Sequence, residues 1–100
     1  MCGRYTLTCP DEAALVRSLP FEEFSETRIQ FQPRYNIAPG QRSPIIYLES
    51  TRLILADGIW GLSRSGGGVT INARSETANR SAMFRDAFRD GRCLVPADGF

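Results

Sequence analysis

The hydrophobic and polar positions of the chain change their spacing several times, and each spacing predicts a different element. A rough alternation of β-forming residues over residues 3–8 predicts a strand close to the N-terminus. Leu15, Val16 and Leu19 share one helical face, which predicts a short helix over residues 10–19. We therefore expect the chain to begin as a strand followed by a helix.

Prolines and glycines interrupt the pattern in the middle of the chain. A second short helix is expected near residues 20–25, whereas two prolines and a glycine in residues 32–41 predict a constrained, extended loop. Two β-rich runs at residues 44–48 and 52–56 are separated by a short polar stretch, which predicts a hairpin. Residues 59–62 are expected to form a third short strand after an Asp-Gly turn.

The last third alternates between flexible and regular stretches. Residues 63–68 are rich in serine and glycine and lack the Gly-Lys-Ser/Thr signature of a phosphate-binding loop, so we interpret them as a connector. Alternation predicts a strand over residues 69–74, and apolar residues at helical spacing predict a helix over residues 81–90. A final buried strand is expected at residues 93–96.

Length and composition fit one small domain. One hundred residues, 42% of them apolar, allow a modest core, and the sequence contains no internal repeat, heptad or domain linker. No apolar run approaches the roughly twenty residues that span a bilayer, and no secretory leader is recognised. We therefore expect no membrane association and a cytoplasmic location, at the nucleoid if the source is bacterial.

The cysteines indicate neither a disulfide framework nor a zinc site. Cys2, Cys9 and Cys93 give an odd number without CxxC spacing. We expect no metal and no cofactor, and we interpret Cys9 and Cys93 as ordinary core or boundary residues.

The small net charge of +1 conceals a segregation of charge. Residues 1–27 hold two arginines and five acidic residues, whereas residues 28–52 hold four arginines and one acidic residue. Residues 63–92 hold six arginines and three acidic residues. Because guanidinium groups bind phosphate in bidentate fashion, a basic set made only of arginine is compatible with nucleic acid, although a GC-rich genome also replaces lysine with arginine.

The N-terminus carries the most reactive group of the chain. A small residue after Met1 favours removal of the initiator, which leaves Cys2 with an α-amine and a thiol on one residue. Such a 1,2-aminothiol condenses with an aldehyde to a Schiff base and closes through sulfur to a thiazolidine. The chain has no lysine, so this is its only nucleophilic amine, and an α-amine has a pKa of about 7.7 to 8.0. The alternative is that position 2 simply tolerates a small residue.

Four groups of motifs, in this order and at these spacings, resemble the SOS response-associated peptidase (SRAP) family of abasic-site processing proteins. They occupy residues 1–5, 33–40, 59–62 together with 72–77, and 92–100. The resemblance runs the whole length of the chain. It implies an α+β fold with a mainly antiparallel, barrel-like β-sheet and a few short flanking helices. Family members are about twice as long, so the chain is expected to be one domain that forms the N-terminal part of a larger SRAP domain.

The resemblance also implies a function. A family member recognises abasic sites in single-stranded DNA and traps the ring-opened sugar aldehyde as a covalent thiazolidine crosslink, with proposed autoproteolytic peptidase and AP-lyase activity. Cys2 is similar to the nucleophile and Asn72 to a polar partner near it, so both are assigned to catalysis. Arg4 and Arg74 are similar to residues that bind phosphate or sugar next to the lesion.

Three further positions are similar to residues near the bases. Pro39 and Trp60 are expected to abut the bases and wedge the strand at the abasic position, and Asn36 is expected to help shape the pocket. A site that lacks a base presents a gap, which an aromatic ring or a proline can fill while arginines hold the flanking phosphates. We therefore expect single-stranded DNA as the partner, and the sequence leaves the oligomeric state open.

Each of these positions also has a purely structural interpretation. Trp60 is alternatively a core or boundary tryptophan, Asn36 and Asn72 are alternatively turn or cap residues, and Arg74 is alternatively the ion-pair partner of Glu76. These alternatives stay open at the level of sequence.

The resemblance is incomplete at its end. The family motif continues past Phe100 with a glutamate and, much later, a histidine that are thought to move protons, and neither position exists in this sequence. Asp98 is expected to make a turn with Gly99 rather than to catalyse. Two other functions therefore remain beside the crosslinking enzyme: a non-catalytic module that binds single-stranded or damaged DNA, and a cysteine peptidase.

Overall fold

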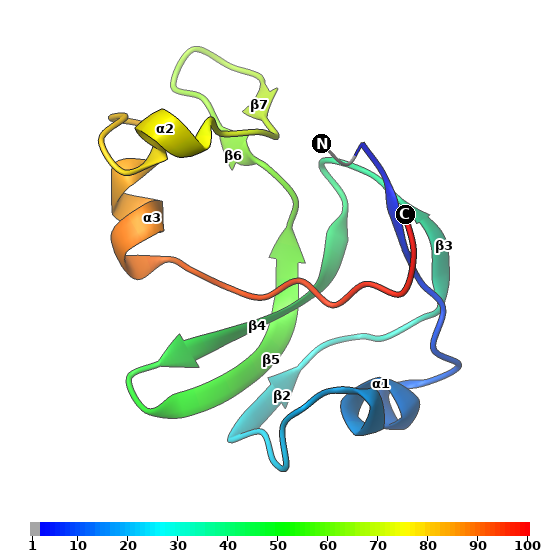
Figure 1. Ribbon diagram of the computed structural model, residues 1–100. Coiled ribbons are helices and arrows are strands. Elements are labelled where there is room, and N and C mark those ends of the chain that lie inside the picture. Colours follow the sequence, from blue (N-terminus) through cyan, green and yellow to red (C-terminus); the bar gives the residue numbers. More distant parts are fainter. Residues whose placement is uncertain (1–2) are drawn as a thin grey trace.

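A computed structural model describes residues 3–100 of the protein (Figure 1). Short strands dominate, and short helices lie between and after them. The elements in chain order are β1 (Tyr5–Leu7), α1 (Glu12–Ser18), β2 (Glu26–Arg28), β3 (Arg34–Ile37), β4 (Arg42–Glu49), β5 (Arg52–Ile59), β6 (Leu62–Ser63), β7 (Val69–Thr70), α2 (Ser75–Ala78) and α3 (Arg85–Asp90).

The strands form small separate sheets rather than a closed barrel. β2, β5 and β4 lie side by side in that order, with β2 parallel and β4 antiparallel to β5. β1 pairs with β3 and β6 pairs with β7, both antiparallel. The α+β class is therefore confirmed, with antiparallel and mixed sheets. The barrel is not found in residues 3–100, because β4 and β5 alone are long and the other pairs are too short to join the sheets.

The β4–β5 hairpin is the longest regular feature, and it extends beyond the predicted strands. Its register runs from Glu49 opposite Arg52 at the turn to Arg42 opposite Ile59 at the far end. The expected Asp57-Gly58 turn is wrong, since both residues lie inside β5. A Cβ at Gly58 would come within 2.9 Å of the Ile45 side chain, so the glycine makes room across the pair of strands rather than turning the chain.

The N-terminal third forms a strand and a helix as predicted. In α1, the Asp11 side chain caps the first turn by accepting a hydrogen bond from the Ala14 amide at 2.7 Å, and Leu15 faces the core. Residues 20–25 form no helix, contrary to expectation. Their backbone instead leads into β2, where the Ser25 amide donates to the Leu53 carbonyl at 2.9 Å and begins the pairing with β5.

The segment expected as a loop over residues 32–41 contains β3. Ile37 of β3 lies opposite Tyr5 of β1 and is completely buried. Tyr5, Leu7, Leu15 and Ile37 form a core cluster. The pairing of β3 with β1 and the burial of Ile37 therefore outweigh the prolines that flank β3. Within residues 32–41, residues 32–33 and 38–41 remain outside the strand.

Residues 59–74 form shorter strands than predicted. Ile59 ends β5 and Leu62 begins β6, so residues 59–62 are a break between two strands and not a strand. The predicted strand over residues 69–74 is limited to β7, whereas the Gly-rich connector of residues 63–68 does join β6 to β7.

The end of the chain also departs from the expected pattern. The helix predicted over residues 81–90 begins only at Arg85, after a turn. The expected buried strand at residues 93–96 is wrong: it makes one isolated bridge, between Leu94 and Ile46, and the Leu94 side chain is 58% exposed. Cys93 is exposed, contrary to expectation, whereas Cys9 is partly buried against the core.

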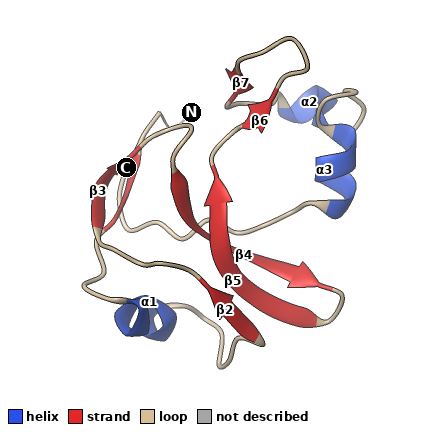
Figure 2. Ribbon diagram, turned by 180° about the vertical axis from the view of Figure 1, so that it is seen from behind, coloured by secondary structure: helices blue, strands red, loops and turns tan. Residues whose placement is uncertain are grey.

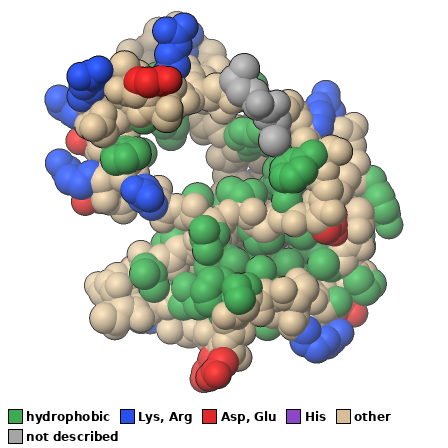
Figure 3. Space-filling view, viewed as in Figure 1, with side chains coloured by type: hydrophobic (Ala, Val, Ile, Leu, Met, Phe, Trp, Pro, Cys, Tyr) green, Lys and Arg blue, Asp and Glu red, His purple; other side chains and the backbone are tan. Residues whose placement is uncertain are grey.

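The elements surround a hollow. β6, β7, α2 and α3 form a lobe beside the hairpin (Figure 2). The red C-terminal end of the chain returns to lie alongside the blue strand β1 (Figure 1). Between the lobe and the hairpin lies an open groove with an apolar floor (Figure 3). Leu48, Leu53 and Leu94 are among its lining residues, together with Arg89 and Arg92.

Candidate functional site

Cys2, the predicted nucleophile, lies outside the described residues 3–100. The structure describes the segment that follows it. Gly3 and Arg4 are exposed and lead directly into β1, whose side chains at Tyr5 and Leu7 are buried in the core. The backbone two residues after Gly3 is therefore fixed by the fold.

Arg4 and Asn36, both predicted site residues, contact each other. The guanidinium Nη1 of Arg4 donates a hydrogen bond to Oδ1 of Asn36 at 3.0 Å, and both side chains are exposed. The contact arises because β1 and β3 are antiparallel neighbours. Asn36 thus orients Arg4, and a guanidinium carries five N–H donors, so further donors of Arg4 remain for a ligand.

The loop of residues 38–41, here called the Pro39 loop, is bonded to Trp60 through the main chain. The Gly40 amide donates to the Trp60 carbonyl at 2.8 Å, and the Trp60 amide donates to the Gln41 carbonyl at 3.1 Å. Gly40 has a φ of 84°, which suits glycine. The segments that carry Pro39 and Trp60, which the family resemblance implies to abut the bases, are therefore held close together.

Arg34 and Gln41 hold the Pro39 loop, a role that the sequence motifs do not predict. The Arg34 Nη1 donates to the Arg42 carbonyl at 2.6 Å, and its Nη2 donates to Oε1 of Gln41. The same Oε1 accepts from the Ala38 amide at 3.0 Å. The polar residues Arg34, at the start of β3, and Gln41, at the end of the loop, are the one sequence feature that indicates such a clamp.

Trp60 has two environments. Its ring lies 5.6 Å from that of Tyr5, tilted by 51°, and the side chain packs against the core cluster. The structural interpretation of Trp60 as a boundary residue is therefore correct for one part of the indole. The partly buried side chain also borders a pocket, which leaves room for a second role.

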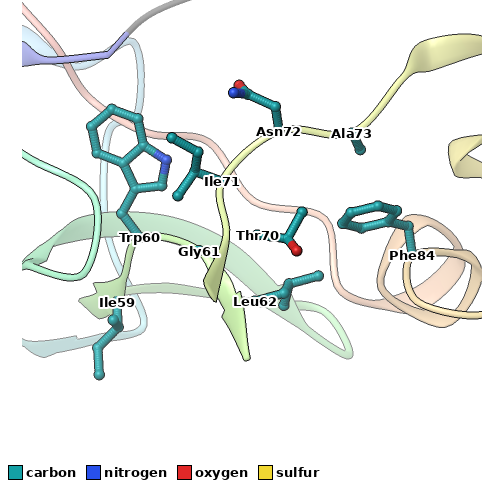
Figure 4. A pocket seen from close by; sticks show the side chains of 9 residues that line it. All are labelled: Ile59, Trp60, Gly61, Leu62, Thr70, Ile71, Asn72, Ala73 and Phe84. Carbon is teal, nitrogen blue, oxygen red and sulfur yellow. The ribbon is translucent and has the colours of Figure 1, made fainter. Parts of the chain in front are cut away.

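A shallow pocket of about 260 Å³ connects Trp60 with Asn72 (Figure 4). Trp60 and Phe84 lie on opposite sides of it, and Asn72 contributes an amide. The complete lining comprises Ile59, Trp60, Gly61, Leu62, Thr70, Ile71, Asn72, Ala73 and Phe84. A mostly apolar hollow whose polar side chains are Thr70 and Asn72 suits a flat or partly apolar group better than a charged one.

Arg74 lies beyond this pocket, at the N-cap of α2, and its side chain is exposed. The ion pair with Glu76 that the sequence left open is not formed. The salt bridges found among residues 3–100 involve four other arginines, Arg28, Arg52, Arg85 and Arg89. Arg74 is therefore a cation at the surface, two residues from Asn72.

Neither a metal centre nor a membrane span is found in the described part of the chain. Within residues 3–100 no group of three or more His, Cys, Asp or Glu side chains is arranged to hold a metal ion. No helix in the same range is long and apolar enough to cross a bilayer.

Comparison with known proteins gives a family match over the whole chain. The sequence profile described as SOS response associated peptidase (SRAP) matches residues 1–100. Abasic site processing protein YoaM of Bacillus subtilis is 32% identical over 106 residues, which cover 100% of this chain and 46% of YoaM. Abasic site processing protein YedK of Escherichia coli is 34% identical over 108 residues, with the same coverage. The chain thus spans about half the length of these relatives.

A solved structure shares the fold. The crystal structure of a protein from Bordetella bronchiseptica superimposes with a TM-score of 0.65 at 23% sequence identity. The match covers 97% of this chain and 48% of that chain. The arrangement of strands and helices described above is therefore also found within a protein of about twice the length.

Proposed function

Because the chain belongs to the SOS response associated peptidase family, we propose that its protein acts in the DNA-damage response by recognising abasic sites in single-stranded DNA. The observation that carries the proposal is the main-chain bonding of the Pro39 loop to Trp60, beside the strand that follows Cys2. Pro39 and Trp60 form a rigid wedge for the gap left by the missing base, and Arg4 and Arg74 bind flanking phosphates.

The chemistry belongs to Cys2. After removal of Met1, the α-amine attacks the aldehyde carbon of the ring-opened sugar, and loss of water leaves a Schiff base. The sulfur then adds to the imine carbon while the imine nitrogen takes up the thiol proton, which closes a thiazolidine. No oxidant or reductant is needed. Asn72 acts as a polar partner in these steps, and the autoproteolytic peptidase and AP-lyase activities use the same thiol and amine.

The proposal extends to the rest of the protein. Residues 1–100 form the N-terminal part of a larger SRAP domain, because the chain covers 46% of YoaM and YedK. The remaining part closes the small sheets toward a barrel and supplies groups that move protons. We place this protein in the cytoplasm, where it meets damaged DNA.

Crosslinking tests the proposal directly. The protein is incubated with single-stranded DNA that carries one abasic site, and the product is analysed by denaturing gel and peptide mass spectrometry. We expect a covalent adduct at Cys2, its absence in Cys2→Ala, and full activity in Cys93→Ala, which removes an exposed thiol elsewhere. A Cys2→Ala protein that crosslinks as well as the wild type contradicts the proposal.

A non-catalytic DNA-binding module is the second candidate, and the exposure of Arg4 and Arg74 favours it. It predicts reversible binding that survives Cys2→Ala and weakens steeply with salt, with a logarithmic slope of about −0.7 for each phosphate contacted. Trp60 is the only tryptophan of the chain, so its fluorescence reports binding in either case. Binding without a covalent adduct in the wild type selects this second function.

A further inference from the structure

The segment of residues 98–99 pairs with β1 on the edge that β3 leaves free. The Thr6 amide donates to the Gly99 carbonyl at 2.9 Å, and the Asp98 amide donates to the Thr6 carbonyl at 3.0 Å. β1 has only three residues, from Tyr5 to Leu7, so hydrogen bonds on both of its edges contribute much of the interaction that holds the strand in position.

The side chain of Asp98 adds a second set of bonds to the same strand. Its Oδ1 accepts from the Thr6 hydroxyl at 2.7 Å, and its Oδ2 accepts from the Thr8 hydroxyl at 2.9 Å and from the Thr8 amide. The hydrogen bond from Thr6, followed by that from the Thr8 backbone, lowers the pKa of Asp98 below its usual range. Asp98 is therefore ionised at neutral pH and bonded to both threonines.

Gly99 is adapted to this contact. A Cβ at Gly99 would lie 2.7 Å from Oγ1 of Thr6. That hydroxyl donates to Asp98, so it can rotate away only by breaking the bond. The pairing of β1 with residues 98–99 thus depends on the residue types at three positions, Thr6, Asp98 and Gly99.

We propose that Asp98 is a positioning residue for the N-terminal nucleophile. This inference rests on the proposed function. Cys2 is joined to β1 through Gly3 and Arg4 alone, so the strand that Asp98 holds sets where the N-terminus is attached. Ring closure requires the amine and then the sulfur to reach one sugar carbon, and reactions of this kind depend strongly on orientation.

The bonding of Asp98 argues against a role in proton transfer. Both carboxylate oxygens already accept hydrogen bonds, from Thr6 and from Thr8, and a carboxylate with a lowered pKa is a weak base. Its contribution is geometric and acts through β1.

The test compares Asp98→Asn with Asp11→Asn. Both changes remove a carboxylate that accepts a hydrogen bond from a backbone amide, but the bond of Asp11 caps α1 and involves no residue of β1. We expect Asp98→Asn to lower the maximal crosslinking rate at saturating abasic DNA roughly tenfold or more. Affinity for a non-reactive tetrahydrofuran analogue of the abasic site and the reaction of Cys2 with a small soluble aldehyde should both stay unchanged, as should every parameter in Asp11→Asn.

Hydrogen exchange provides a readout of the strand itself. We expect faster exchange of the Thr6 and Thr8 amides in Asp98→Asn, with unchanged protection at Ile54 and Leu55 of β5. Thr8→Val, which removes one hydroxyl and retains the shape, should slow crosslinking less, and it serves as the test if Asp98→Asn does not fold. A wild-type protein that forms no crosslink overturns the proposed function. Crosslinking at the wild-type rate in the Asp98 and Thr8 variants, or equal slowing in Asp11→Asn, overturns only the positioning role.

Discussion

At Gly61 the chain passes from β5 into β6 with a φ of 112°, in the left-handed region that favours glycine. A Cβ there would collide with Cγ1 of Val69 on the neighbouring β7. Trp60 and Leu62 on either side of it line the pocket, so one glycine sets the spacing of the pocket wall. Sequence inspection finds the motif around Gly61 but not the contact with Val69, because that contact follows from the β6–β7 pairing.

Gly61→Ala should therefore destabilise the protein by about 1 to 3 kcal/mol, through backbone strain and overpacking against Val69. Chemical denaturation measures the free energy of unfolding. Gly66→Ala is the matched control, since Gly66 lies in the exposed connector and a Cβ added there would meet no other heavy atom within 4 Å. Equal stability of the two variants would show that the β6–β7 contact does not constrain the chain.

At the scale of elements, the sequence pattern predicts those helices and strands that form through interactions between residues close in sequence. The β4–β5 hairpin and α1 follow from residues near each other in sequence, and both are found close to the expected positions. β2 and β3 are not predicted because each exists through a distant partner, β5 and β1 respectively. The site shows the same division. Motifs single out Asn36, Pro39 and Trp60 as candidates, whereas the hydrogen bonds from Arg4 to Asn36 and between the Pro39 loop and Trp60 appear only in the fold.

The Arg34 clamp on the Pro39 loop gives a prediction at this scale. Arg34→Met removes the bonds to Gln41 and to the Arg42 carbonyl, so the loop should loosen and the Gly40 amide should exchange faster. Affinity for single-stranded DNA, measured by Trp60 fluorescence, should fall several-fold, in keeping with about 1 kcal/mol for a lost hydrogen bond.

Arg42→Met is the control for charge, because it removes an equal charge whose side chain does not hold the loop. If both variants weaken binding equally, Arg34 acts through its charge and the clamp has no part in binding.

At the scale of the whole molecule, the chain combines a small core with much exposed apolar surface. Leu48 and Leu94, which line the open groove, are each more than half exposed, and so is the neighbouring Val95. A domain of this size has a small free energy of unfolding, so interactions far from the site affect the fraction of the protein that is folded. One of these is a cluster of exposed charges near the hairpin turn, in which Glu26 bonds to Arg28 and Arg52.

This cluster predicts how stability depends on pH. The bonds from Arg28, with a further contribution from Arg52, lower the pKa of Glu26 from 4.5 to about 2. Its stabilising effect is fully present above about pH 4.5 and is lost as the pH falls toward 2. Thermal unfolding should show a small loss in this window that is absent in Glu26→Gln. Glu22→Gln, at an exposed position outside the cluster, should retain the wild-type profile.

The bonds from Thr6 to Asp98 and Gly99 join residues more than ninety positions apart, and this separation orders events during synthesis. The first strand leaves the ribosome long before its second partner exists, so it cannot acquire both edges until residues 98–99 have emerged. The initiator methionine can be removed while the N-terminus is still unconstrained. Under the proposed function, the strand that carries the nucleophile therefore gains its second partner only after Gly99 has been synthesised, so crosslinking in the final geometry must await that stage of translation.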